Sequence, residues 1–130
     1  MNRGDGYKYA DITAKIIGSS MKVHQKMRGG YQEHIYQSCL RIEFKKNDLS
    51  FEEEVELPIF YDNIIVGKRR VDFLADKKIV VEIKAVSQLG DVHIAQALNY
   101  LEVLKLEIGL LINFGNTSLQ FKRIMKPKGK

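Results

Sequence analysis

The stretch Val71-Asp72-Phe73-Leu74, followed closely by Val80-Val81-Glu82-Ile83-Lys84, decides which fold and chemistry this chain is expected to have. It sets two acids and a lysine into two apolar, strand-like runs. Because side chains alternate between the two faces of a strand, Glu82 and Lys84 are predicted on one face and Ile79, Val81 and Ile83 on the other. A charge on a core strand needs a partner or a metal ion, since an unpaired buried charge costs on the order of several kcal/mol. Two carboxylates beside a lysine suit a divalent cation and a phosphate.

The composition is that of one folded domain spanning residues 1–130, with 45% hydrophobic residues. Lys and Arg total 21 against 16 Asp and Glu, which gives a net charge of +5 and a pI near 9.3. This excess is compatible with a polyanionic partner, although many proteins without one share it. Lys68, Arg69 and Arg70 are candidate nucleic-acid contacts just before Asp72. The basic segment 122–130 fits a solvated tail equally well.

A single cysteine, Cys39, excludes an intramolecular disulfide and a cysteine-based zinc cluster. This indicates a reducing, intracellular setting, with Cys39 as a small core residue. The polar start of the chain lacks the apolar segment of a signal peptide, and no run approaches the roughly 18 apolar residues of a membrane span. We therefore expect a cytoplasmic protein with no membrane partner.

Hydrophobic periodicity predicts three helices and five strands. The expected helices span residues 9–27, 31–46 and 92–106, and the expected strands span residues 51–60, 64–75, 78–85, 108–114 and 119–124. The order ααβββαββ predicts an α/β fold with a mixed (α+β) sheet. The two-residue link Asp76-Lys77 implies an antiparallel pair, and the helix crossing from the third strand to the fourth should leave those two parallel. Pro58 predicts an edge strand or a bulge.

Whether Asp72 approaches Glu82 and Lys84 depends on the register of the second and third strands, which the sequence leaves open. If they meet, Asp72, Glu82 and the backbone carbonyl of Ile83 are candidate ligands of Mg²⁺. The ion would activate a bound water, and Lys84 would orient the nucleophile or stabilise the transition state. The other interpretation is a cross-strand ion-pair cluster, because short motifs often match by chance.

A third acid, Glu33, shares a helix face with Tyr36 and Leu40 and would point along an apolar stripe toward the metal. Its alternative role is that of a first-turn glutamate favoured by the helix dipole. Both roles remain open at this point.

On the later helix, Gln96 and Tyr100 lie four residues apart with His93 one turn before them. This polar strip would contact phosphate or hold Lys84 in place. Taken singly, Gln96 and Tyr100 also fit core or rim positions, and His93 fits a surface or hydrogen-bonded histidine. The three histidines show no metal-ligand spacing.

Together these residues resemble the PD-(D/E)XK nuclease superfamily, in which an acid on the second strand precedes a (D/E)-X-K motif on the third. The matching residues are Asp72 and Glu82-Ile83-Lys84. Gln96-Ala97-Leu98-Asn99-Tyr100 is similar to the Gln-xxx-Tyr motif of the RecB-like branch. Gly30-Tyr31-Gln32-Glu33-His34-Ile35-Tyr36 resembles the signature of the small GxxExxY proteins. One departure is Val71, where the superfamily usually has proline.

The resemblance implies a restriction-endonuclease-like αβββαβ core with an extra N-terminal helix. It also implies a Mg²⁺ pocket from Glu33, Asp72 and Glu82, with Lys84 as the catalytic lysine and with Gln96 and Tyr100 lining the site. We expect a Mg²⁺- or Mn²⁺-dependent nuclease acting on DNA or RNA, DNA being the expected partner.

The alternative is a non-catalytic nucleic-acid-binding or assembly module on the same scaffold. A homodimer through the first helix is a further possibility. The sequence leaves open whether that helix covers its own sheet or a partner. In either nucleic-acid interpretation, Lys68, Arg69, Arg70 and His93 are the expected contacts.

Overall fold

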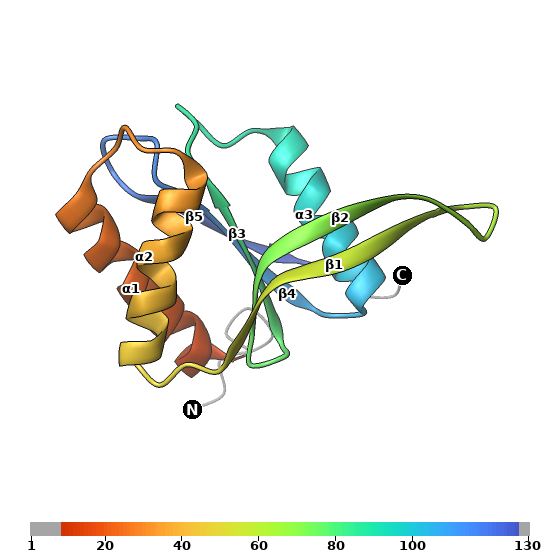
Figure 1. Cartoon of the computed structure of the whole chain (residues 1–130), viewed down its shortest axis with the longest axis horizontal. Coiled ribbons are helices and arrows are strands. Elements are labelled where there is room, and N and C mark those ends of the chain that lie inside the picture. Colours follow the sequence, from red (N-terminus) through yellow and green to blue (C-terminus); the bar gives the residue numbers. More distant parts are fainter. Residues whose placement is uncertain (1–8, 128–130) are drawn as a thin grey trace.

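The computed structural model describes residues 9–127, which form a five-stranded mixed sheet with helices on both faces (Figure 1). The helices are α1 (Ala10–Met27), α2 (Glu33–Lys46) and α3 (Asp91–Leu104). The strands are β1 (Phe51–Tyr61), β2 (Ile64–Ala75), β3 (Ile79–Lys84), β4 (Ile108–Asn113) and β5 (Gln120–Met125). The type and order of every predicted element are confirmed. The ends differ from the expected ones by one or two residues, as helix and strand ends commonly do.

The strands lie side by side in the order β1-β2-β3-β4-β5. Neighbours are antiparallel except β3 and β4, which are parallel and joined by α3. The predicted antiparallel link and the predicted parallel pair are both confirmed. Pro58 lies in the edge strand β1, next to a register shift between Ile59 and Phe60, so both features expected from this proline are present.

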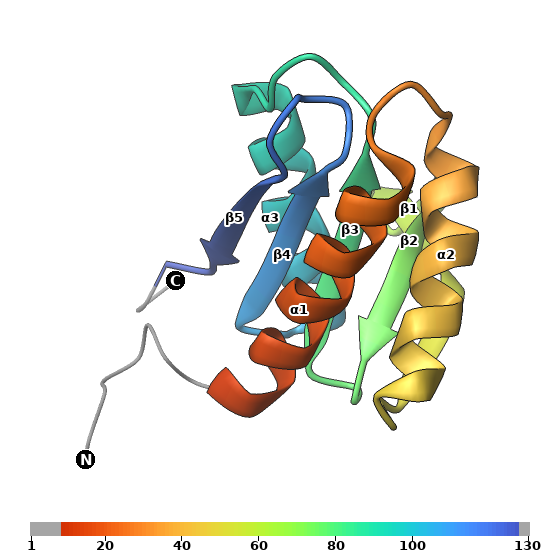
Figure 2. The same cartoon turned by 90° about the vertical axis from the view of Figure 1, so that its left-hand side faces the viewer.

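Two hydrophobic clusters fill the space on either side of the sheet. α1 and α2 cover one face, and α3 covers the other (Figure 2). Side chains from alternate positions of β3 enter different clusters, with Val81 and Ile83 toward α1 and α2 and Val80 toward α3. Ile16 and Val23 of α1 are buried against this sheet. The extra N-terminal helix therefore covers its own sheet, which answers the question that the sequence left open.

The β1–β2 hairpin leaves the sheet at Asp72. β2 pairs with β3 only over residues 73–75, and beyond that point the hairpin leans over α3 (Figure 1). Phe73 packs on the α2 side, whereas Val71 packs with the α3 cluster, so the buried face changes at Asp72. Glu54, on the facing part of β1, has a φ of 56°, a left-handed conformation that is uncommon for residues other than glycine and accompanies the bend. The strands β2 and β3 therefore fork at Asp72.

The exit of β3 is held against β4 by a buried asparagine. The Asn113 Nδ2 donates to the Val86 carbonyl at 2.8 Å, and its Oδ1 accepts the Val86 amide at 2.9 Å and the Gly115 amide at 3.0 Å. The backbone approaches so closely here that a Cβ on Gly115 would lie 2.3 Å from the Val86 carbonyl oxygen. The segment that follows Lys84 is therefore fixed in place.

Replacing Gly115 with alanine is expected to lower the free energy of unfolding by about 1–3 kcal/mol, because the added methyl group forces backbone atoms apart. Gly18→Ala is the matched control. A Cβ at Gly18, inside α1, meets nothing within 4 Å, so this change should raise stability by about 0.5–1 kcal/mol. Urea unfolding followed by circular dichroism measures both, and equal effects of the two substitutions would contradict the close approach.

Candidate active site

Asp72 and Glu82 face each other across the fork between β2 and β3. The Asp72 amide donates to Glu82 Oε2 at 2.8 Å, and the Ile83 amide donates to Asp72 Oδ2 at 2.8 Å. The backbone hydrogen bonds between β2 and β3 end at Phe73 and Val81. The two bonds from backbone amides to carboxylates lie just beyond that point. The register that the sequence could not decide is thus the one that brings the two acids together.

The surroundings of both carboxyl groups disfavour their charged forms. Burial is the largest effect raising the pKa of Asp72, the Glu33 charge adds to it, and the Ile83 amide and the Lys84 charge oppose it. Burial, followed by the charge of Asp72, raises the pKa of Glu82 to about 8. Without a cation, the surroundings of the two acids therefore disfavour their ionised forms. A bound cation would stabilise both carboxylates.

The backbone adds a third oxygen. The Lys84 carbonyl accepts the Phe114 amide at 2.9 Å, on the β4 side of β3, whereas the Ile83 amide points to Asp72 on the β2 side. Because successive peptide groups of a strand point to opposite neighbours, the Ile83 carbonyl also faces the fork. Two carboxylates and a carbonyl are the hard oxygen donors that Mg²⁺ takes alongside its own waters. The predicted ligands fit a divalent cation.

Within residues 9–127, no three carboxylate, imidazole or thiol side chains gather closely enough to hold a metal by themselves. This agrees with a site that uses two carboxylates and completes its shell with backbone and water, as Mg²⁺ sites commonly do. Glu33, the predicted third acid, is exposed on α2 rather than packed into the pair. Its charge nevertheless contributes to the raised pKa of both Asp72 and Glu82, so it lies near enough to act on the site.

Lys84 lies between the acids and α3. Its Nζ donates to Gln96 Oε1 at 3.1 Å and lies 4.0 Å from Glu82 Oε1, with only 14% of the side chain exposed. Gln96 thus holds the lysine beside the carboxylate, one of the two roles expected for it. Because the ammonium is largely shielded from water, its charge acts strongly on neighbouring groups.

Tyr100 is buried on the same side of the sheet. Burial raises the pKa of its phenol, the Glu82 charge raises it further, and Arg69 acts in the opposite direction. The hydroxyl therefore stays protonated near neutral pH and is available as a hydrogen-bond donor. Tyr100 and Arg69 thus share the electrostatic environment of the acidic pair.

His93 has a local structural contact. Its Nδ1 accepts the Gly90 amide at 3.0 Å and so caps the start of α3. The hydrogen-bonded histidine that the sequence allowed at this position is confirmed, although the sequence did not identify its partner, the glycine three residues before it at the helix start. Its expected contact with nucleic acid stays a prediction.

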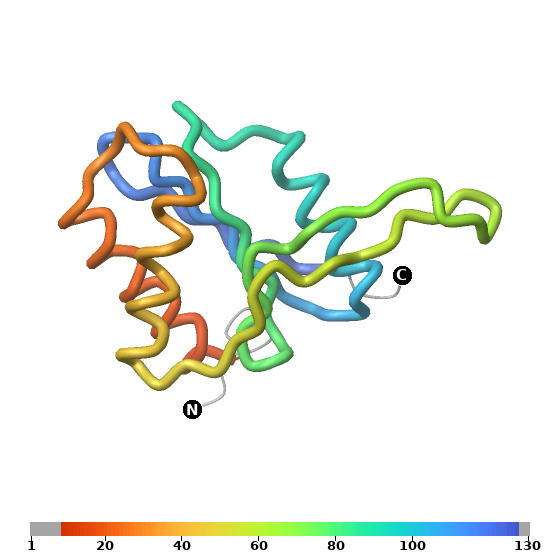
Figure 3. Tube along the Cα trace, viewed as in Figure 1, coloured from red at the N-terminus to blue at the C-terminus, as the bar shows by residue number. Residues whose placement is uncertain are grey.

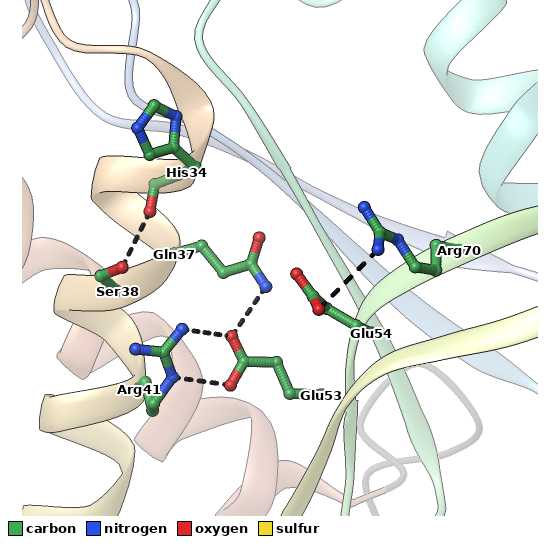
Figure 4. Close-up of polar contacts among 7 residues, drawn as sticks. All are labelled: His34, Gln37, Ser38, Arg41, Glu53, Glu54 and Arg70. Carbon is green, nitrogen blue, oxygen red and sulfur yellow. Dashed lines mark hydrogen bonds and ion pairs between the residues drawn. The ribbon is translucent and has the colours of Figure 1, made fainter.

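An open cavity of about 600 Å³ lies beside the acidic pair. Glu33 and Asp72 line it from opposite sides, and Figure 4 shows part of the wall between α2 and the hairpin. The remaining lining residues are Tyr31, Gln32, His34, Gln37, Glu54, Arg70 and Ala85. Almost all of these side chains are polar or aromatic, so the cavity is suited to a hydrated, charged ligand.

The turn before α2 explains why Glu33 stands at this cavity. Gly30 has a φ of +106°, a conformation that glycine adopts readily. The Tyr36 hydroxyl donates to the Arg28 carbonyl at 2.5 Å and accepts the Tyr31 amide at 3.2 Å, and its ring stacks on Phe114 at 4.6 Å. Sequence reasoning placed Tyr36 on an apolar stripe and in the GxxExxY signature, but it did not predict these contacts. The Gly-x-x-Glu-x-x-Tyr spacing indicates this contact, because it places Tyr36 one turn after Glu33 on the helix that the turn leads into.

A half-buried ion pair between α2 and β1 was also missed. Arg41 donates to both Glu53 carboxylate oxygens at 2.7 Å, and Gln37 donates to one of them at 2.7 Å (Figure 4). The Arg41 hydrogen bond is the main cause of the lowered pKa of Glu53. The alternation of side chains along β1 could have indicated it. Glu53 lies on the same inward face of β1 as Phe51, whereas Glu52 and Glu54 are exposed.

The predicted basic run is partly neutralised. Lys68 lies 3.8 Å from Glu56, and Arg70 lies 3.8 Å from Glu54, across the hairpin. Both pairs are exposed, so each is weak and easily exchanged for another anion. Lys68 and Arg70 remain accessible, but their net charge is smaller than the sequence alone indicated.

Comparison with known proteins identifies the class. A profile of the PD-(D/E)XK nuclease superfamily matches residues 10–124, and the chain belongs to that superfamily, whose members generally use divalent metal ions. No curated protein matches the chain. No helix within residues 9–127 is long and apolar enough to cross a membrane.

Two solved structures share the fold. SSO0001 has a TM-score of 0.58 and 22% sequence identity, and the match covers 94% of this chain and 60% of that one. An alkaline exonuclease, LHK-Exo, from Laribacter hongkongensis has a TM-score of 0.50 and 11% identity, with 91% of this chain and 82% of that one covered. The expected mixed-sheet nuclease core is confirmed. This chain spans only about 60% of SSO0001.

The metal-free protein is expected to lose stability as the pH rises. Unfolded Glu82 ionises near its ordinary value of 4.5, whereas folded Glu82 holds its proton to about 8, so the unfolding free energy falls between these values. The slope reaches at most about 1.4 kcal/mol per pH unit. Thermal unfolding with a chelator present should show this slope, and Glu82→Gln, which stays neutral, should flatten it. A Glu82→Gln slope equal to that of the wild type would contradict the assigned shift.

Proposed function

We propose that this protein is a Mg²⁺- or Mn²⁺-dependent nuclease that hydrolyses phosphodiester bonds of DNA or RNA. Within the superfamily we place it in the RecB-like branch, among the GxxExxY proteins, and we expect it to act in the cytoplasm. The observation that carries the proposal is the juxtaposition of Asp72 and Glu82 across the fork, with the Lys84 ammonium 4.0 Å from Glu82. An exposed acid, Glu33, faces the same cavity.

Each side chain has a role in this proposal. Asp72, Glu82 and the Ile83 carbonyl would hold the divalent ion, and Glu33, which lines the same cavity as Asp72, would add a third negative charge near it. The bound ion supplies Lewis-acid polarisation of the phosphate and lowers the pKa of a coordinated water. Lys84 places a cation where negative charge develops during phosphoryl transfer.

The residues of α3 position that lysine and supply a donor. Gln96 accepts a hydrogen bond from Lys84 Nζ, so the ammonium cannot swing away from Glu82. The protonated Tyr100 hydroxyl is a second donor on the same side. Because pre-positioned donors need no reorganisation during reaction, both favour the transition state over the substrate.

The surroundings of the site suit a nucleic-acid backbone. Arg70 lines the cavity with Asp72, and Lys68 lies two residues further along the hairpin. Their weak pairs with Glu54 and Glu56 can be exchanged for phosphate oxygens. Such contacts would orient a strand across the acidic pair without reading its sequence.

The second candidate is a non-catalytic nucleic-acid-binding or assembly module. The observation that favours it is that, within the described residues 9–127, no three metal-ligating side chains gather at one point. In this case the acidic pair and Lys84 would serve only as an ion-pair cluster. Binding would persist without cleavage and would weaken steeply with salt.

Cleavage of labelled single-stranded, duplex and branched DNA and of RNA, with Mg²⁺ or Mn²⁺, separates the two functions. We expect wild-type cleavage that a chelator abolishes, and a loss of at least about 100-fold in Lys84→Ala and Asp72→Ala, because each change removes a charge that acts in the transition state. Lys122→Ala, which removes an exposed lysine on β5, is the matched control and should keep full activity. Salt-dependent binding with no cleavage of any substrate would favour the binding module instead.

A further inference from the structure

The turn between α1 and α2, residues 28–32, lies beside the β4–β5 loop (Figures 2 and 3). The His24 Nε2 lies 3.0 Å from the Asn116 carbonyl oxygen, which ties α1 to that loop. Ala85, directly after β3, lines the cavity of about 600 Å³ that Asp72 also lines, so this cavity opens at the same end of the sheet. We call it the active-site cavity and residues 28–32 the α1–α2 turn.

Consecutive residues of the α1–α2 turn line two different cavities. Tyr31 lines the active-site cavity together with Asp72. Arg28 and Gly30 line a second open cavity of about 460 Å³, whose other lining residues are Gly29 and residues 115–117. We call it the Arg28 cavity. A long, flexible ligand in the active-site cavity can therefore reach the Arg28 cavity by crossing the turn.

Tyr31 presents an aromatic ring at the active-site cavity. The residue is 48% exposed, although its ring contacts the buried ring of Tyr36 with 6.0 Å between centroids and 78° between planes. In an edge-to-face pair the edge of one ring meets the face of the other, so Tyr36 leaves at least one face of the Tyr31 ring uncovered. The Tyr31 amide also donates to the Tyr36 hydroxyl at 3.2 Å. The ring is therefore held in place before any ligand binds.

An uncovered aromatic face is suited to a nucleic-acid base. Any base can stack on such a ring, because every base has a π-face. Inside a duplex both faces of a base are covered by its neighbours, so only an unstacked base can meet the ring. A single exposed tyrosine is ordinary on a protein surface. This one is distinguished by sharing a cavity with Asp72, which the proposed function assigns to the metal ion.

The charge of the active-site cavity makes contacts outside its acidic wall necessary. Glu33, Glu54 and Asp72 all line it, whereas Arg70 is the one lysine or arginine among the described residues that do. Before a metal ion binds, this excess of acids repels a phosphodiester backbone. Stacking on Tyr31 does not depend on charge, and a cation beyond the acids would add attraction.

The Arg28 cavity has the chemistry of a phosphate site. Arg28 is exposed, and within residues 9–127 its guanidinium forms no ion pair, whereas Lys68 and Arg70 are both paired with glutamates. The amides of Gly29 and Gly30 likewise form no hydrogen bond in this part of the chain. None of the residues that line the cavity is acidic. A guanidinium and free backbone amides are donors that phosphate oxygens commonly accept.

We propose that the substrate strand is unpaired beside the position where it is cut and crosses the α1–α2 turn. One base stacks on Tyr31, and the phosphate of a neighbouring nucleotide binds Arg28. This inference rests on the proposed nuclease function and names its substrate class, a single-stranded segment of nucleic acid. Because neither contact reaches the hydrogen-bonding edge of a base, the strand is bound without regard to its sequence.

Fluorescence anisotropy of labelled single strands and of the same sequences as duplexes tests the stacking, with a chelator present so that nothing is cleaved. We expect single strands to bind more tightly. Tyr31→Leu removes the ring and should weaken single-strand binding by at least about fivefold, whereas Tyr31→Phe keeps the ring and should bind within about twofold of the wild type. Tyr61→Leu, at a 70% exposed position on the β1–β2 hairpin, is the matched control and should leave binding unchanged.

Photo-cross-linking locates the base directly. Iodouracil in the single strand should join to Tyr31 on irradiation, as mapped by mass spectrometry, and Tyr31→Leu should remove that product. Tyr61→Leu should leave it in place. A product formed mainly on the exposed aromatic residues of the hairpin, Phe60 and Tyr61, would overturn the proposed path of the strand.

The salt dependence of single-strand binding tests the phosphate contact. Arg28→Ala should reduce the slope of log K against log salt by about 0.7, the value for one phosphate of a single strand. Lys122→Ala, which removes an exposed cation on β5, is the control and should keep the wild-type slope. An unchanged slope in Arg28→Ala would overturn the assignment of the Arg28 cavity.

Failure of this inference differs from failure of the proposed function. Tighter binding of duplexes than of single strands, or single-strand binding that Tyr31→Leu leaves intact, would overturn the inference while metal-dependent cleavage still stood. Single-strand binding that depends on Tyr31, without cleavage of any substrate, would support the path of the strand and overturn the nuclease. A protein that binds no nucleic acid would overturn both.

Discussion

The fork between β2 and β3 is the constraint on which the rest of this structure depends. Where the regular ladder stops, Asp72 and Glu82 replace it with two bonds from backbone amides to carboxylates. These bonds hold the two strands together and keep the two carboxylates next to each other. The arrangement costs stability without a cation, since burial raises the pKa of both acids and the charge of Asp72 raises the pKa of Glu82 further. A region that folds at such a cost is typical of a functional site.

Three anchors keep the fork in shape. Asn113 ties the exit of β3 to β4, Tyr36 ties the turn before Glu33 to Phe114, and Glu53 ties β1 to Arg41 of α2. Each anchor satisfies buried or half-buried polar groups with hydrogen bonds, and a satisfied polar network specifies one geometry more sharply than apolar packing does. The site therefore rests on packed helices and strands, while the hairpin beyond the fork extends away from the sheet (Figure 1).

Much of this was predictable from local pattern. Strand alternation placed Glu82 and Lys84 on one face, the crossing helix made β3 and β4 parallel, and Pro58 marked the edge strand. The anchors were not predicted, because each joins residues far apart in the chain. Glu53 and Arg41, or Asn113 and Val86, reveal their pairing only once helices and strands are packed. The sequence allowed a hydrogen-bonded His93, but its partner, the Gly90 amide, depends on where the helix begins.

The sequence by itself determined the elements, their order, the mixed sheet and the identity of the acids and lysine, because hydrophobic periodicity and motif spacing are local properties of the chain. Only the tertiary structure decided that Asp72 meets Glu82, that Glu33 stands at the rim, and that α1 covers its own sheet. The physical reason is register. Strand pairing and the bend at Glu54 follow from packing between distant segments, so no short stretch of sequence contains them.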